Sequence, residues 1–145
     1  MKTSIITAIP ALVASAAVTA APTAEVYATW PATNFREGCS PGGCISSFNI
    51  SAPAGYVKGM PAFNVACHPI YIQSGWLECD PVGEQAAGSV VEALWTNTSQ
   101  RELINISVAH IFIEGEKRTN ASGFAEFTSG TTEFSLPVTS IIAVL

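Results

Sequence analysis

The feature that most constrains the fold is a strict alternation of side chains between residues 101 and 115, in the run RELINISVAHIFIEG. A period of two is typical of a β-strand with one face on a core, whereas a helix repeats every 3.6 residues. One parity is mainly apolar, and it comprises Ile104, Ile106, Val108, His110, Phe112 and Glu114. The spacing therefore predicts a strand whose Ile104 parity faces the interior.

Shorter alternating segments surround this strand at residues 45–51, 62–67, 88–95, 122–129 and 131–145. In the third segment Val91, Ala93 and Trp95 share one face. Residues rich in Gly, Pro, Asn and Ser separate the segments. One helical turn is conceivable near residues 83–94, but Gly83 and Gly88 weaken it. The pattern predicts an all-β protein, a single small β-barrel or β-sandwich of about 7–9 antiparallel strands.

The N-terminus has the pattern of a secretory signal peptide. Lys2 is a short basic region, residues 5–18 are mostly apolar, and Val18 and Ala20 are the small residues of a cleavage site. A buried helix or a membrane anchor is the alternative, but Pro10 interrupts the stretch, which is short for a span of roughly 20 residues. We expect a signal peptide over residues 1–20 and one β-rich domain over residues 21–145, secreted to the extracellular space.

The chain beyond this signal is acidic. Without Lys2 it has five basic and eleven acidic residues, a formal charge of −6. Such a surface repels nucleic acid, and no basic cluster offsets the repulsion. No later segment is long and apolar enough to cross a membrane, and no polybasic patch would bind one. We expect neither nucleic acid nor membrane as a partner, and no cofactor.

Four cysteines remain in the secreted part: Cys39, Cys44, Cys67 and Cys79. An even number in a short secreted protein indicates two disulfides, although four cysteines allow three pairings. The turn at residues 41–43 can bring the first two cysteines together, and the other two flank a connection between strands. Zinc would need two paired ligand clusters, and a redox pair normally has the Cys-x-x-Cys spacing. We therefore favour Cys39–Cys44 and Cys67–Cys79 as structural disulfides, without a metal.

Four Asn-x-Ser/Thr sequons agree with a secretory route. They begin at Asn49, Asn97, Asn105 and Asn120. Asn97 and Asn120 have polar, turn-like neighbours and are the better candidates for a glycan. Asn49 and Asn105 lie within expected strands, where a glycan requires an outward-facing side chain.

Catalytic patterns are weak. A Ser-His-Asp triad would need His68 or His110 beside a nucleophile, and no Gly-x-Ser-x-Gly elbow is present. His110 falls on the core face of its strand, which is typical of a structural histidine, and His68 should be exposed. Paired carboxylates could hydrolyse glycosides, but the positions of the glutamates select no pair. The sequence does not indicate an enzyme.

Aromatic residues suggest a binding surface. They could stack on a sugar or another flat ligand, or they could pack the core, which is the stronger reading for Trp95. Tyr71 and Trp76 lie inside the loop between Cys67 and Cys79, where they could face solvent or fold inward to cap the barrel. The candidate binding residues are His68, Tyr71, Gln73 and Trp76.

A resemblance covers residues 26–80. An aromatic-led first strand, YATWPATNFREG, leads by a hairpin into SSFNIS, and a glycine-containing turn, AFNVAC and the closing WLEC follow. This arrangement resembles the Alternaria major-allergen family of secreted fungal β-barrel proteins. The resemblance implies an intramolecular Cys67–Cys79 disulfide. It also implies action as an allergen, an elicitor of plant defence or an effector that binds host defence proteins.

The chain departs from that family in its cysteines. The Cys39/Cys44 pair is additional, whereas a second pair near the C-terminus and an unpaired N-terminal cysteine are missing. We therefore expect a monomer or a non-covalent dimer. No functional residue transfers, because the shared residues are architectural.

These observations give three hypotheses about function. The leading one is a secreted fungal effector-like or elicitor-like protein that binds a host plant protein or a cell-wall glycan without catalysis. The second is a secreted carbohydrate- or small-ligand-binding module, and the third is an unrecognised hydrolase.

Overall fold

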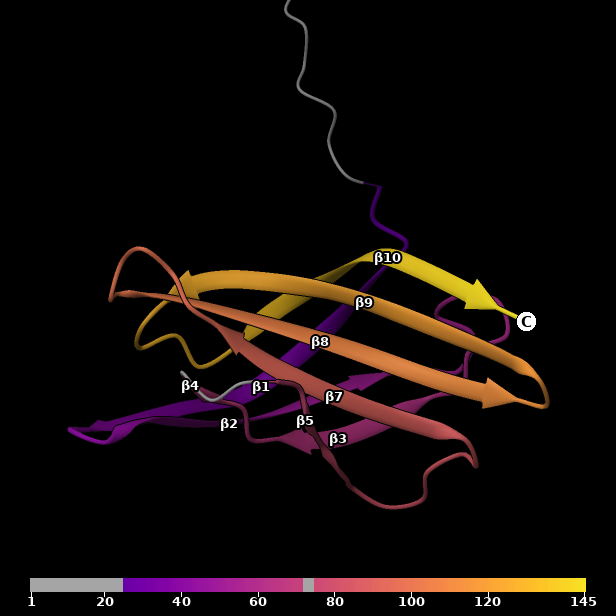
Figure 1. The fold of residues 1–145 in the computed structure, drawn as a ribbon, viewed down its shortest axis with the longest axis horizontal. Helices are drawn as coiled ribbons and strands as arrows, with labels where there is room; N and C mark the ends of the chain where they lie inside the picture. Colours follow the sequence, from indigo (N-terminus) through magenta and orange to yellow (C-terminus); the bar gives the residue numbers. More distant parts are fainter. Residues whose placement is uncertain (1–24, 72–74) are drawn as a thin grey trace, which may run out of the picture.

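The fold is all β. A computed structural model describes residues 25–71 and 75–145, and these form strands and no helix. Seven strands of five or more residues carry the fold (Figure 1). They are β1 (Ala28–Ser40), β2 (Gly43–Ala52), β3 (Phe63–Cys67), β7 (Ser89–Thr96), β8 (Leu103–Glu114), β9 (Lys117–Thr128) and β10 (Phe134–Val144). Three two-residue strands complete it: β4 (Ile70–Tyr71), β5 (Leu77–Glu78) and β6 (Asp80–Pro81).

The strands form one antiparallel sheet that curls into a nearly closed barrel of nine strands. Its order is β5-β7-β8-β9-β10-β1-β2-β3-β6, and β4 pairs with β2 outside this path. The predicted all-β class is confirmed, and of the two predicted architectures the barrel is the one observed. Residues 1–24, which include the predicted signal peptide, lie outside the described part of the chain.

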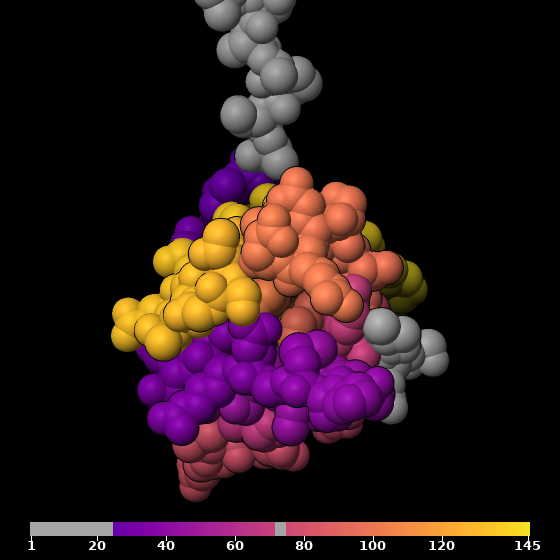
Figure 2. All heavy atoms as spheres, turned by 90° about the vertical axis from the view of Figure 1, so that its left-hand side faces the viewer, coloured from indigo at the N-terminus to yellow at the C-terminus, as the bar shows by residue number. Residues whose placement is uncertain are grey.

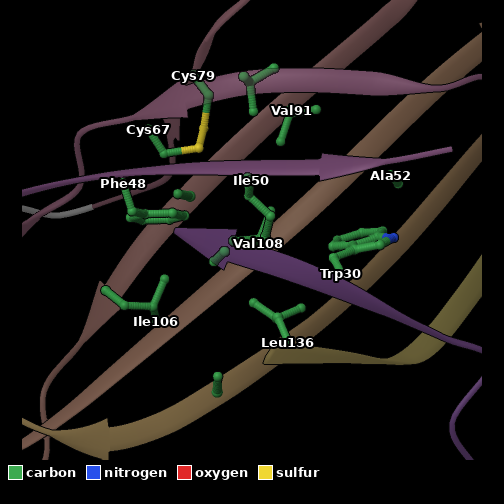
Figure 3. Close-up of a cluster of buried hydrophobic side chains, with 14 of the residues drawn as sticks. Trp30, Phe48, Ile50, Ala52, Cys67, Cys79, Val91, Ile106, Val108 and Leu136 are labelled. Carbon is green, nitrogen blue, oxygen red and sulfur yellow. A yellow bond between two sulfur atoms is a disulfide. The ribbon is translucent and has the colours of Figure 1, made fainter. Parts of the chain in front are cut away.

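The barrel closes through the short segment from Leu77 to Pro81. Its first half pairs with β7 and its second half pairs with β3, so it bridges the two strands at the seam. Between these halves the Cys79 N–H donates to Val91 O at 2.8 Å. The Cys67–Cys79 disulfide ties the end of β3 to the middle of this bridge (Figure 3). The second disulfide, Cys39–Cys44, closes the tip of the β1–β2 hairpin, so both predicted pairings are confirmed.

Side chains fill the barrel along its length. In Figure 3 Phe48 and Ile106 lie towards one end, Ile50 and Val108 in the middle, and Trp30 towards the other end. At the first end, rings of Phe35, Phe48, Phe127 and Phe134 pack with centroids 4.4–6.1 Å apart. At the second end, rings of Trp30, Tyr56, Phe63 and His110 pack at 4.7–6.1 Å. The interior is therefore a packed core.

The clearest strand prediction is confirmed from Ile104 to His110, whereas further along β8 Phe112 is half-buried and Ala109 and Ile111 of the other parity are buried as well. Ile104, Ile106, Val108 and His110 are at most 1 % exposed, and the apolar parity of β8 faces the core. On β7 Val91, Ala93 and Trp95 are likewise buried. The helical turn considered near residues 83–94 is absent, and β7 takes its place.

One prediction about the C-terminal half is wrong. The strand expected from residue 122 begins at Lys117, because the β8–β9 turn needs only Gly115 and Glu116. Gly115 adopts a positive φ of 61° there, which glycine accepts without strain. Asn120 therefore lies within β9, paired with Ile111 and Ile142, and its expected turn-like setting is incorrect.

The seam disulfide should stabilise the fold more than the hairpin disulfide. Cys67 and Cys79 are 12 residues apart and Cys39 and Cys44 are 5 apart, so the first pair restricts the unfolded chain more strongly. We expect replacement of both Cys67 and Cys79 by Ala to cost about 3 kcal/mol of unfolding free energy. The matched replacement of Cys39 and Cys44 should cost less, as measured by urea denaturation. Equal losses would contradict the role assigned to the seam.

Gly123 is required by a close approach between β9 and β10. A Cβ atom at this position would lie 1.8 Å from Pro137 O. We expect Gly123→Ala to lower the unfolding free energy by about 1–3 kcal/mol, the range of overpacked cores. Gly38→Ala is the control, since a Cβ there has nothing within 4 Å, and it should leave the denaturation midpoint nearly unchanged.

Candidate functional site

The candidate binding residues lie around the segment that the seam disulfide ties down. His68 directly follows β3, Tyr71 lies in β4, and Trp76 directly precedes β5. Gln73 lies outside the described residues. The segment is fixed at three places in the described part: by β4 on β2, by β5 on β7 and by the Cys67–Cys79 bond. The described parts of this segment are thus anchored to the barrel on both sides of residues 72–74.

An open trough of about 590 Å³ runs along the outer side of this segment. The trough is lined by Arg36, Glu37 and Gly38 of β1 and by Ile45, Ser46 and Ser47 of β2, and His68 and Ile70 form one wall. Ile45 is 65 % exposed and is one of several large apolar side chains that face outward on the strands, with Ile113, Phe124, Ile142 and Val144. The lining of the trough therefore combines the apolar Ile45 and Ile70 with the charged Arg36 and Glu37 and with His68.

Two local features shape the trough. The β1–β2 register shifts between Thr33 and Arg36, and Asn34 has a φ of 55°, which together form a bulge. A bulge bends its strand and increases the local twist. On the opposite wall, the buried Ser46 hydroxyl donates to Pro69 O at 2.7 Å and holds the residues that follow β3 against β2.

His68 is exposed, as predicted, and faces a carboxylate. Its Nε2 lies 3.7 Å from Asp80 Oδ2, and the two side chains are 58 % and 79 % exposed. A polar contact this exposed contributes little to stability. Both groups remain accessible to a partner.

Tyr71 and Trp76 differ in their surroundings. The Tyr71 ring packs on Trp95 with centroids 5.3 Å apart, and its hydroxyl donates to Asn97 Oδ1 at 2.5 Å. Tyr71 is half-buried and packs against the core. Figure 2 faces the end of the barrel where the β1–β2 hairpin (purple) and the connections β7–β8 (orange) and β9–β10 (yellow) lie. Trp76 is 41 % exposed, whereas Trp30 and Trp95 are buried. Trp76 is thus the tryptophan available to a partner.

A second constellation lies at the other end of the barrel. The Ser89 hydroxyl lies 2.7 Å from His110 Nε2, and the Tyr56 hydroxyl lies 2.7 Å from His110 Nδ1. A hydroxyl can donate or accept, so either tautomer of the imidazole is satisfied at both nitrogens. His110 is fully buried and Ser89 is 7 % exposed. The predicted structural role of His110 is confirmed, but the sequence did not identify its two partners.

Burial determines the protonation states of His110 and Tyr56. It lowers the pKa of His110 from 6.5 to about 4, and it raises the pKa of Tyr56. All three partners are therefore neutral at neutral pH. A histidine with so low a pKa is a weak general base there.

The buried histidine should make the fold sensitive to acid. The unfolded chain takes up this proton near pH 6.5 and the folded chain only near pH 4, so stability is unaffected above that window and is lost on descending through it. The loss should reach on the order of 3 kcal/mol. We expect His110→Gln to remove this part of the pH dependence in urea denaturation series at pH 7 and pH 4. If the unfolding free energy of the wild type falls between pH 7 and pH 4 by the same amount as that of His110→Gln, His110 is not the source of the acid sensitivity.

The four sequons occupy different settings. Asn97 follows β7 in an exposed turn, as predicted, and Asn49 is exposed on the outer face of β2. Asn105 on β8 and Asn120 on β9 are half-buried. The Asn120 Oδ1 atom is buried without a hydrogen-bond partner in the described structure.

No protein-family model, curated protein or solved structure matches this chain. Among the described residues there is no group of three or more His, Cys, Asp or Glu side chains that could hold a metal ion. The same residues include no helix that could span a membrane. The chain is therefore defined by its fold, a small antiparallel β-barrel with two disulfides, which is compatible with an extracellular protein.

Proposed function

We propose that this chain is a secreted fungal protein of the effector or elicitor type, which acts by binding a host plant protein and not by catalysis. The proposal rests on one observation. Exposed apolar side chains lie close to the seam, where a disulfide and short strand pairings fix the backbone. Ile45 in the trough and Trp76 beside the seam are 65 % and 41 % exposed. Binding residues are frequently found on connections that a rigid scaffold holds in position.

Such a site can bind with little ordering cost. The disulfide and the two short strand pairings fix the backbone on both sides of residues 72–74. Fixing a loop in advance reduces the entropy lost on association. A tryptophan in an interface often contributes 2 kcal/mol or more. Arg36 and Glu37 line the trough beside Ile45 and would select a partner that presents complementary charges next to an apolar group.

The buried constellation supports binding over catalysis. A nucleophile must reach its substrate, but Ser89 is 7 % exposed and His110 is fully enclosed. Neutral His110 is also a weak base at neutral pH. The Ser89–His110–Tyr56 set is thus better suited to satisfying buried polar groups than to hydrolysis.

A carbohydrate is the second candidate partner. Trp76 offers one exposed aromatic face of the kind on which sugars stack. A plant cell-wall glycan would meet that requirement, and the experiment below separates it from a protein.

The test is capture from plant apoplastic fluid by the oxidised protein, followed by affinity measurement with the purified partner. We expect Trp76→Ala and Ile45→Glu each to weaken binding at least about tenfold, or 1.4 kcal/mol, with little change in melting temperature. Ile142→Glu is the matched control, because Ile142 is 59 % exposed on β10, away from the trough. It should bind like the wild type.

Three outcomes would decide the matter. Loss of binding in both test variants with a protein partner supports the proposal, and the same loss with a polysaccharide supports the second candidate. Equal affinity of wild type, Trp76→Ala and Ile45→Glu would overturn the assignment of this surface.

A further inference from the structure

The sequon at Asn97 lies in a well-defined turn at the end of β7. Asn97 and Ser99 are exposed. Between them, the Thr98 hydroxyl makes hydrogen bonds with Gln100 O at 2.6 Å and with Leu103 O at 2.9 Å. The backbone that carries Asn97 is therefore held in place.

The side chain of Asn97 is held as well. Its Oδ1 accepts the Tyr71 hydroxyl at 2.5 Å, and the Tyr71 ring in turn packs on Trp95. This bond fixes the amide with Oδ1 towards the protein, which leaves Nδ2 as the free end. An N-linked glycan is attached through Nδ2, and the amide oxygen remains an acceptor. A glycan at Asn97 is thus compatible with the Tyr71 bond.

The other sequons lack this arrangement. Asn105 and Asn120 are half-buried within strands, and the Oδ1 of Asn120 is enclosed. Asn49 is exposed on β2, but no side-chain hydrogen bond in the described structure orients its amide. Among the four, Asn97 is the residue whose amide is both exposed and oriented.

Asn97 is also close to the proposed binding surface. Leu77 pairs with Ala93, so Trp76, one residue before it, lies at about the level of Leu94 on the neighbouring β7. Three residues of strand, which span roughly 10 Å, separate that level from Asn97. A branched oligosaccharide that starts at Asn97 can extend over this distance.

We propose that Asn97 carries an N-linked glycan, oriented by Tyr71, which covers the face around Trp76 and so regulates access to the binding surface. In the reaction, Asn97 Nδ2 forms a bond to C1 of the first sugar of a lipid-pyrophosphate-linked oligosaccharide. The bond between that C1 and the pyrophosphate oxygen breaks, and one amide proton leaves. The inference rests on the proposed function in two respects, because it needs passage through a secretory pathway and a binding role for Trp76.

The first experiment measures the glycan and its effect on Trp76 without any partner. The full chain is secreted from a yeast host as wild type and as Ser99→Ala, which removes the sequon and keeps both Asn97 and its bond to Tyr71. We expect glycopeptide mapping to find a glycan on Asn97 of the wild type. An unmodified Asn97 in the secreted wild type would overturn the inference.

Acrylamide quenching of tryptophan fluorescence then reports exposure of Trp76, because the other two tryptophans, Trp30 and Trp95, are buried. We expect quenching of the glycosylated wild type to be weaker than that of Ser99→Ala. Ser122→Ala, which removes the sequon at Asn120 on β9, is the matched control and should be quenched like the wild type. Equal quenching of the wild type and Ser99→Ala, with Asn97 occupied, would show that the glycan does not cover Trp76.

The second experiment uses the partner captured above. We expect Ser99→Ala to bind it at least about tenfold more tightly than the glycosylated wild type. If Trp76→Ala abolishes binding while Ser99→Ala and the wild type bind equally, the regulatory role of the glycan fails and the proposed function stands. If Trp76→Ala binds normally in the Ser99→Ala background, the proposed function itself fails.

Discussion

The structure depends on how the barrel is closed. β3 and β7 are joined across the seam by five residues, Leu77 to Pro81, which pair for two residues on each side. Such short strand pairings provide few hydrogen bonds. The Cys67–Cys79 disulfide adds a covalent link at the point where the pairing of β5 with β7 ends and that of β6 with β3 begins. Partial closure shortens the unpaired edges of β3 and β7, on which aggregation would begin. It also allows side chains from the seven long strands to share one core.

A filled interior directs function to the outside. The barrel contains aromatic groups at both ends and aliphatic groups between them, and its buried histidine is satisfied by two hydroxyl groups. The described outer wall, by contrast, offers large apolar side chains without cover, among them Trp76 on the tied segment and Ile45 on β2, which pairs with Ile70 of that segment. The same disulfide that closes the core thus supports the surface that we propose for binding.

The sequence predicts the fold where the alternation of apolar and polar side chains is strong. It does not predict features that depend on tertiary contacts. The parity of β8 from Ile104 to His110 was read correctly because burial on one face requires a period of two. The start of β9 was placed too late, since Lys117 and Arg118 pair with β8 although their polarity suggested a turn. Gly123 gave no signal of its packing role, because the approach of Pro137 arises only after β9 and β10 pair.

The candidate site was predicted only in part. The spacing of Cys67 and Cys79 identified the tied segment. The sequence left open whether Trp76 faces solvent or folds inward, and the structure shows that it is exposed. The trough was missed, because it forms when a bulge in β1 brings Arg36 and Ile45 beside the wall that carries His68. The bond between Tyr71 and Asn97 joins residues 26 positions apart, and no local pattern indicates it.

Alternation also explains how one short segment can serve both the fold and a partner. In the bridge, Cys79 is buried in the core and Leu77 is half-buried, whereas Trp76, Glu78 and Asp80 are exposed. Substitution of an outward residue leaves the seam pairings intact, because those pairings use the backbone and the inward disulfide. The outer face can therefore change its partner without loss of barrel closure. A surface of this kind is free to vary in chemistry while its geometry stays fixed.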